Sequence, residues 1–248
     1  MNRVVYTLAL MLLAAPALAS PGVNLRWDRC YGDGGVINRT FACDSNAGMS
    51  ILIGSMESGA DRSDVLGQEI VVDIQAQSTT LPAWWQFKSA GSCRQNALSM
   101  APIPPDNPVA CLDWAQGQTT GWIGAYRIGA RGPQTARIIA AIVVPLSQPA
   151  TMVTGQEYFL FQLRILHIKT VGTGACEGCC VPVQVTFNTT KVTTPAPEND
   201  RVYYGPTDGT DSHYAIWQSY SPYGPLPPPC GPVPTRGSSW SALKALYR

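Results

Sequence analysis

The stretch GQEYFLFQLRILHIK, Gly155 to Lys169, decides the fold class. Its side chains alternate in character, as those of a β-strand do when one face of the sheet is buried. One face is almost wholly apolar, which predicts that it lies in a hydrophobic core, and it carries Phe159, Phe161, Leu163, Ile165 and His167. The opposite face carries Tyr158, Leu160, Gln162, Arg164, Leu166 and Ile168.

Further strand-like runs lie on both sides of this stretch, each bounded by turn residues. They cover Met49 to Glu57, Gly67 to Gln77, Thr135 to Leu146 and Val181 to Thr194. In the second of these, Ile70, Val72 and Ile74 share one face. No helical periodicity of any length occurs between Pro21 and Thr194. The pattern predicts an all-β protein, an antiparallel β-sandwich of immunoglobulin-like or jelly-roll-like type.

The N-terminus has the pattern of an export signal. Arg3 precedes the apolar run VVYTLALMLLAAPA, and Ala17-Leu18-Ala19 offers the small residues that signal peptidase requires. Cleavage after Ala19 leaves about 229 residues. No later run is long and apolar enough to span a bilayer, so we expect a secreted or cell-surface protein without a transmembrane segment.

The pattern divides the chain into four parts: a signal peptide (1–19), a β-sandwich domain (20–194), an aromatic and proline-rich extension (195–237) and a short tail helix (238–248). The extension contains SPYGPLPPPCGPVP, which has no core of its own. Helices as short as the tail are marginal alone, so the tail is expected either to dock on a partner or to remain mostly disordered. The residues proposed for docking are Trp240, Leu243, Lys244, Tyr247 and Arg248.

Charge excludes two classes of partner. The chain has 17 Lys and Arg against 16 Asp and Glu, and charged residues make up only 13% of it, well below the roughly 25% of typical soluble domains. No basic stripe is present, so we expect neither nucleic acid nor an anionic membrane surface as a partner.

Eight cysteines in an exported chain predict four disulfides, with 105 possible pairings. Proximity in the sequence favours Cys30 with Cys43 and Cys93 with Cys111. A bond between the adjacent residues Cys179 and Cys180 would violate disulfide geometry. Cys176 is therefore expected to pair with one of them, and Cys230 with the other, so that the proline-rich segment is fastened to the domain.

The run HIKTVGTGACEGCC, His167 to Cys180, allows two other interpretations, a redox centre and a zinc site. A redox CxxC requires a following helix, whereas Val181-Pro182-Val183 reads as a strand. A zinc site needs a second pair of ligands, and only His167 and His213 are available. We therefore expect disulfides, a buried and hydrogen-bonded His167, and no metal or cofactor.

Aromatic residues supply the candidate ligand-binding site. In an extended LPAWWQF segment, Trp84 and Trp85 face opposite ways, so that one is buried and the other more exposed. An exposed tryptophan can stack on a sugar or anchor a protein. Trp122 and Tyr126, assigned to one face of GWIGAYRI, extend such a platform if the two segments are neighbours. A surface protein or a polysaccharide is the expected partner.

No catalytic set stands out. The chain contains no G-x-S-x-G elbow, and its acids Asp73, Asp113 and Glu157 have no spacing that indicates a glycosidase pair. The leading hypothesis is an exported, non-catalytic structural or adhesion protein with a sorting tail. The alternatives are a carbohydrate-binding module and a hydrolase that gathers these acids near His213.

The segments VNLRWDRCYGDGG, FACDSNAG, LPAWWQFKSAGSCR, ARGPQTARIIAAIVVP and KTVGTGACEGC together resemble a group of uncharacterised exported bacterial proteins. The ending WSALKALYR resembles the W-x-x-x-K-x-L-Y-R tails of secreted proteins from such bacteria. Relatives often close the cysteine patch with Pro-Val-Cys, where this chain has Gln184. The resemblance implies that Cys180 supplies the missing sulfur. At the level of the fold, a strand, a linker that ends in Gly155 and a long aromatic strand are also similar to immunoglobulin-like and cohesin-like sandwiches.

Overall fold

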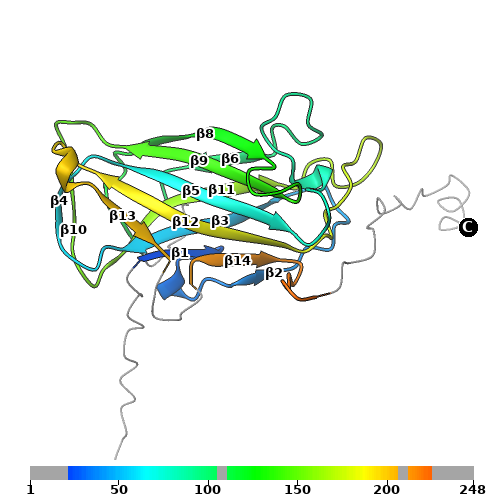
Figure 1. Ribbon diagram of the computed structural model, residues 1–248, viewed down its shortest axis with the longest axis horizontal. Helices are drawn as coiled ribbons and strands as arrows, with labels where there is room; N and C mark the ends of the chain where they lie inside the picture. The colour runs from blue at the N-terminus through cyan, green and yellow to red at the C-terminus, as the bar shows by residue number, and fades with distance from the viewer. Residues whose placement is uncertain (1–21, 105–110, 206–211, 225–248) are drawn as a thin grey trace, which may run out of the picture.

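The computed structural model describes residues 22–104, 111–205 and 212–224, which form two β-sheets packed face to face (Figure 1). The strands are β1 (Gly22–Trp27), β2 (Asn38–Arg39), β3 (Met49–Glu57), β4 (Arg62–Val65), β5 (Gly67–Ala76), β6 (Leu98–Ala101), β7 (Leu112–Asp113), β8 (Thr120–Ile128), β9 (Thr135–Val143), β10 (Ala150–Met152), β11 (Glu157–Leu166), β12 (Val183–Thr193), β13 (Arg201–Tyr204) and β14 (Tyr214–Trp217). Three short 3-10 turns join them: η1 (Tyr31–Asp33), η2 (Ala83–Trp85) and η3 (Pro197–Asn199).

The first sheet has five strands in the order β1-β3-β11-β6, with β7 pairing beside β11. The second has seven, in the order β2-β14-β12-β5-β9-β8, with β13 pairing beside β12. Figure 1 shows β8, β9, β5, β12 and β13 lying side by side across this larger sheet. Strands β4 and β10 form a separate two-stranded ladder. All pairs are antiparallel except β7 with β11 and β14 with β2, which are short and parallel.

The predicted β-sandwich is confirmed, and the long strands lie where the sequence indicates. Strand β3 has the predicted bounds, and β5, β9, β11 and β12 differ from their predicted runs by a few residues at their ends. The choice between an immunoglobulin-like and a jelly-roll-like arrangement stays a prediction.

The predicted face of β11 is wrong at one end. A β-bulge lies between Phe159 and Phe161, so that Leu160 is the extra residue against β3. Because a bulge shifts the alternation by one residue, Tyr158 and Leu160 face the main core before it, and Phe161, Leu163 and Ile165 face that core after it. Phe159 is buried on the opposite side of the sheet, in a small cluster with Cys30, Ile53 and Cys111.

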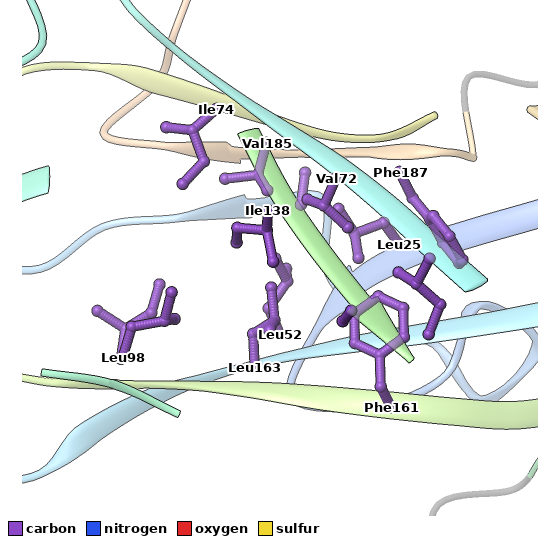
Figure 2. Packing of buried hydrophobic residues seen from close by; sticks show 14 of the residues in the cluster. Leu25, Leu52, Val72, Ile74, Leu98, Ile138, Phe161, Leu163, Val185 and Phe187 are labelled. Atoms are coloured by element: carbon purple, nitrogen blue, oxygen red, sulfur yellow. The ribbon is translucent and has the colours of Figure 1, made fainter. Parts of the chain in front are cut away.

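The main core fills the space between the sheets (Figure 2). Leu25, Leu52, Phe161 and Leu163 of the smaller sheet lie opposite a row of side chains from the larger one, which comprises Val72, Ile74, Ile138, Val185 and Phe187. In β5 the three residues that share one face in the sequence pattern, Ile70, Val72 and Ile74, are all buried. The apolar face of this strand therefore lies in the core.

The sandwich extends beyond the predicted boundary at Thr194. Strand β13 pairs with the end of β12, and β14 pairs with its beginning, so both belong to the larger sheet. This part of the predicted extension is therefore a component of the domain. The predicted signal peptide (1–19) and the predicted tail helix (238–248) lie outside the described residues. The described part of the chain contains no helix that is long and apolar enough to cross a membrane.

Candidate functional site

The two adjacent tryptophans do not form a surface platform. Trp84 and Trp85 lie in the 3-10 turn η2 and not in an extended segment, and both are fully buried. Trp84 stacks on Trp217 with ring centroids 5.3 Å apart, and Trp85 meets Trp84 edge to face at 5.2 Å. The expectation that one of the pair is exposed is wrong, because a turn directs both rings into the end of the core.

A buried arginine completes this aromatic cluster. The guanidinium of Arg94 lies over the Trp84 ring and donates hydrogen bonds to the carbonyl oxygens of Trp84 (2.7 Å), Ile168 (3.1 Å) and Leu166. Arg94 is only 1% exposed, and burial lowers its pKa to about 9. The side chain therefore remains charged at neutral pH, held by carbonyl dipoles and a ring face. Its contacts join η2 to the end of β11, which is a structural role.

The disulfides differ from the pairings favoured by proximity. Cys30 bonds to Cys111, Cys43 to Cys179 and Cys93 to Cys176. The predicted bonds of Cys30 with Cys43 and of Cys93 with Cys111 are therefore wrong. So is the predicted bond of Cys176 with Cys179 or Cys180. Local separation failed because the strands between these cysteines bring distant loops together, across 81, 136 and 83 residues respectively.

The segment around Cys176 is thus a structural junction. Cys176 and Cys179 hold two loops that are far apart in the sequence, and Cys180 is also disulfide-bonded. The sequence predicts that Cys230 bonds to one of the two adjacent cysteines. Because Cys179 is bonded to Cys43, the predicted partner of Cys230 is Cys180. Cys230 lies outside the described residues, so this pair stays a prediction.

His167 is buried and hydrogen-bonded, as expected. Its Nε2 lies 2.9 Å from the Ser50 hydroxyl, its Nδ1 lies 2.9 Å from the Ala47 carbonyl oxygen, and its ring stacks on Phe41. Burial lowers the pKa of His167, with a smaller contribution from nearby arginines. In the part of the chain that the structure describes, no three His, Cys, Asp or Glu side chains gather into a group that could hold a metal ion.

The three candidate acids lie apart and have other partners. Asp73 accepts two hydrogen bonds from Arg137, at 2.7 and 2.8 Å, on the outer face of the larger sheet. Asp113 caps its own turn by accepting from the backbone N–H groups of Ala115 and Gly117. Glu157 is buried on the smaller sheet, where it accepts from the N–H groups of Tyr31 and Gly32 and from the Ser55 hydroxyl. The geometry does not assemble these acids into one site.

Trp122 is the exception among the tryptophans. Of the six in the described residues, five are buried, whereas Trp122 on the edge strand β8 is 53% exposed. It lies on the outer face of the larger sheet, opposite Ala141 of β9. An exposed tryptophan offers a large apolar surface together with an N–H donor, and tryptophan is enriched at binding hot spots. Trp122 therefore marks this face as the candidate functional surface.

Tyr126 does not share that face with Trp122. A bulge between Ile123 and Ala125 shifts the alternation of β8, so Tyr126 points inward. Its ring packs edge to face on Phe87 and its hydroxyl donates to the Trp85 carbonyl oxygen. Burial raises the pKa of Tyr126. The predicted pairing of Trp122 with Tyr126 on one platform is wrong because the sequence does not reveal the bulge.

The strand registers place the rest of this outer face in rows. We call it the outer sheet face. Its first row runs Trp122, Ala141, Glu69, Lys191 and Val202 across β8, β9, β5, β12 and β13. The second row runs Ala125, Ile139, Val71, Thr189 and Tyr204. Val202 and Tyr204 are exposed at the far edge, and the residues between them and Trp122 are mostly small or aliphatic.

The third row of the outer sheet face is charged. It runs Arg127, Arg137, Asp73, Thr186 and Tyr214 across β8, β9, β5, β12 and β14. Asp73 pairs with Arg137 and also with Arg131, at 3.3 Å. Two arginines therefore share one carboxylate, and the third, Arg127, lies opposite Arg137 without contacting Asp73. Asp73 and Trp122 can each be singled out as candidates from the sequence. No local sequence pattern, however, indicates the strand register that places them on one surface.

Comparison with known proteins identifies no family. No protein-family model matches the chain, and no curated protein does. Among solved structures, the chain is similar to a cohesin module from a family 33 glycoside hydrolase of Clostridium perfringens. The identity is 8%, the TM-score is 0.33, and the match covers 79% of this chain and 94% of that one. We base no functional step on a similarity of this size. The resemblance to exported bacterial proteins and the tail's docking residues stay predictions.

Proposed function

We propose that this chain is an exported, non-catalytic binding protein whose ligand surface is the outer sheet face. The observation that carries the proposal is the exposure of Trp122 on the outer face of the larger sheet, in a protein that buries its other described tryptophans. Tryptophan is the residue type most enriched at binding hot spots. Its backbone belongs to the larger sheet, in which β8 pairs with β9, β9 with β5, and β5 with β12.

The setting supports a role outside the cell. The N-terminal pattern predicts export, and the disulfides are of the kind that persists in oxidising compartments. Three bonds that link distant loops suit a protein that must remain folded without cellular maintenance. In this proposal the tail, residues 238–248, is an address for sorting or docking. Its deletion is expected to change where the protein accumulates, and unchanged localisation would refute that part.

The test is adhesion to the cells that produce the protein. Purified mature protein, labelled at its N-terminus, is mixed with washed producing cells, and the bound fraction is measured after sedimentation. Trp122→Ala is expected to weaken binding at least about fivefold, since aromatic contacts contribute about 1 kcal/mol or more. The matched control is Leu112→Ala, because Leu112 has the same 53% exposure but lies on β7 of the other sheet. Equal binding by both variants and the wild type would refute the proposal.

A further inference from the structure

The charged row of the outer sheet face contains an uncompensated cation. Arg127 and Arg137 are directly opposite each other on β8 and β9. Like charges in this relation repel. Asp73 compensates Arg137 by a bidentate contact and also pairs with Arg131. Within the described ranges, by contrast, the exposed guanidinium of Arg127 has no ion pair and no hydrogen bond.

The Trp122 ring leans toward this cation. A Cβ atom built on Gly124 would lie 3.8 Å from Trp122 Nε1, so the indole covers the glycine two residues further along β8. This is the direction of Arg127. The partners of Trp122 and Arg127 on β9 are Ala141 and Arg137, four residues apart, which places the two rows about 13 Å apart along the strands.

The residues between Trp122 and the arginines are glycine, alanine and isoleucine. Gly124 and Ala125 on β8, and Ala141 and Ile139 on β9, separate the indole from the arginines. The hollow lined by Asp61, Arg62, Ser63, Asp64, Thr194, Pro195, Ala196 and Asn199 lies away from this region, at the end of β4 and β12. Protein hot spots usually occupy well-packed pockets. An exposed aromatic ring and a cation separated along one strand fit a chain of sugar rings better.

We infer that the ligand of the outer sheet face is a polysaccharide that carries carboxylates. This inference rests on the proposed function and names the ligand class for the same surface. The indole of Trp122 stacks on the apolar face of one sugar ring. Arg127 donates charge-assisted hydrogen bonds to the carboxylate of a sugar further along the chain, which also relieves its repulsion with Arg137.

Affinity electrophoresis in gels that contain a defined polymer tests the inference. The probes are polygalacturonate and its methyl ester, which have the same sugar backbone and differ in charge. Retardation by polygalacturonate is expected to be at least about tenfold stronger than by the ester, because a charge-assisted hydrogen bond contributes about 1.5 kcal/mol or more. Added salt is expected to weaken retardation, because it screens the exposed charges.

Two variants and two controls assign the effect to the surface. Arg127→Ser is expected to lose the preference for polygalacturonate, and Trp122→Ala to weaken retardation by both polymers. Arg29→Ser is the matched charge control, because Arg29 is exposed and pairs with Asp33, outside the outer sheet face. Leu112→Ala is the control for the aromatic variant. Unchanged thermal unfolding of each variant excludes loss of the fold as the cause.

The outcomes separate the inference from the function that it extends. Equal retardation by both polymers, weakened by Trp122→Ala, overturns the acidic ligand and leaves the proposed binding surface standing. If neither polymer retards the protein but adhesion to cells still depends on Trp122, the acidic ligand is also overturned and the proposed binding surface stands. If Trp122→Ala changes neither retardation nor adhesion, both the inference and the proposed function are refuted.

Discussion

The guanidinium carbon of Arg94 lies 3.5 Å from the centroid of the Trp84 ring, in a site from which solvent is almost excluded. No carboxylate compensates this cation within the described residues; its partners are three backbone carbonyl groups and two aromatic rings. The carbonyl groups belong to Trp84 of η2, to Leu166 at the end of β11 and to Ile168 just after it. One side chain therefore holds the cysteine-rich end of the sandwich to its core.

Arg94→Ala is expected to destabilise the protein by about 3 kcal/mol or more, because it leaves buried carbonyl groups unpaired and opens a cavity. Arg94→Lys keeps the charge but cannot reproduce three hydrogen bonds from a planar group, so it is expected to recover only part of the loss. Urea unfolding measures both variants. If Arg94→Ala unfolds within about 0.5 kcal/mol of the wild type, the structural role assigned to Arg94 is wrong.

Gly54→Ala is expected to be destabilising by about 1 to 3 kcal/mol. A Cβ atom at this position would lie 2.3 Å from the Phe161 ring, which packs edge to face on Phe187 in the core. Gly124→Ala is the matched control, since its Cβ would meet only ordinary contacts at 3.6 and 3.8 Å. Thermal unfolding compares the two, and an equal effect of both substitutions would contradict the packing described for Phe161.

His167 is expected to make the protein less stable in mild acid. Its pKa is lowered in the folded state by burial, so the unfolded chain binds the proton more readily. Stability is therefore complete above the unfolded pKa of about 6.5 and falls as the pH drops from that value toward the folded pKa. Urea midpoints at pH 7.5 and pH 5.5 measure this loss, and His167→Gln is expected to reduce it. An unchanged pH dependence in the variant would rule out His167 as the source.

The disulfide pattern predicts four bonds that join distant segments. Peptide mapping without reductant is expected to yield Cys30–Cys111, Cys43–Cys179 and Cys93–Cys176, with Cys180 joined to Cys230. Replacing Cys43 and Cys179 together by serine is expected to cost about 4 kcal/mol or more, because the bond closes a long loop. Recovery of a Cys30–Cys43 peptide would contradict the arrangement of the loops at this end of the sandwich.

The sequence predicts those features that depend on local patterns. Alternation places Ile70, Val72 and Ile74 in the core and locates the main strands, because one buried face imposes a period of two residues. It fails at Phe159 and Tyr126, where an extra residue in a bulge reverses the faces without a compositional signal. It fails at Trp84 and Trp85 because a single 3-10 turn replaces the expected extended segment.

Disulfide pairing and the binding surface depend on relations that no local pattern contains. Cys43 and Cys179 meet because the strands between them cross the domain, not because they are close in the chain. Trp122 is identifiable as a candidate from its residue type. Its association with Arg127, Arg137 and Asp73, however, follows from the registers of β8, β9 and β5. These registers are set by the packing of whole sheets.

Hydroxyl-radical footprinting of the wild-type protein bound to producing cells tests the central claim most directly. If the outer sheet face is the binding surface, oxidation of Trp122, Val202 and Tyr204 falls on binding, whereas Leu112 on β7 and the exposed Tyr223 remain as reactive as in the free protein. Equal oxidation of Trp122 in the bound and free protein would contradict the claim.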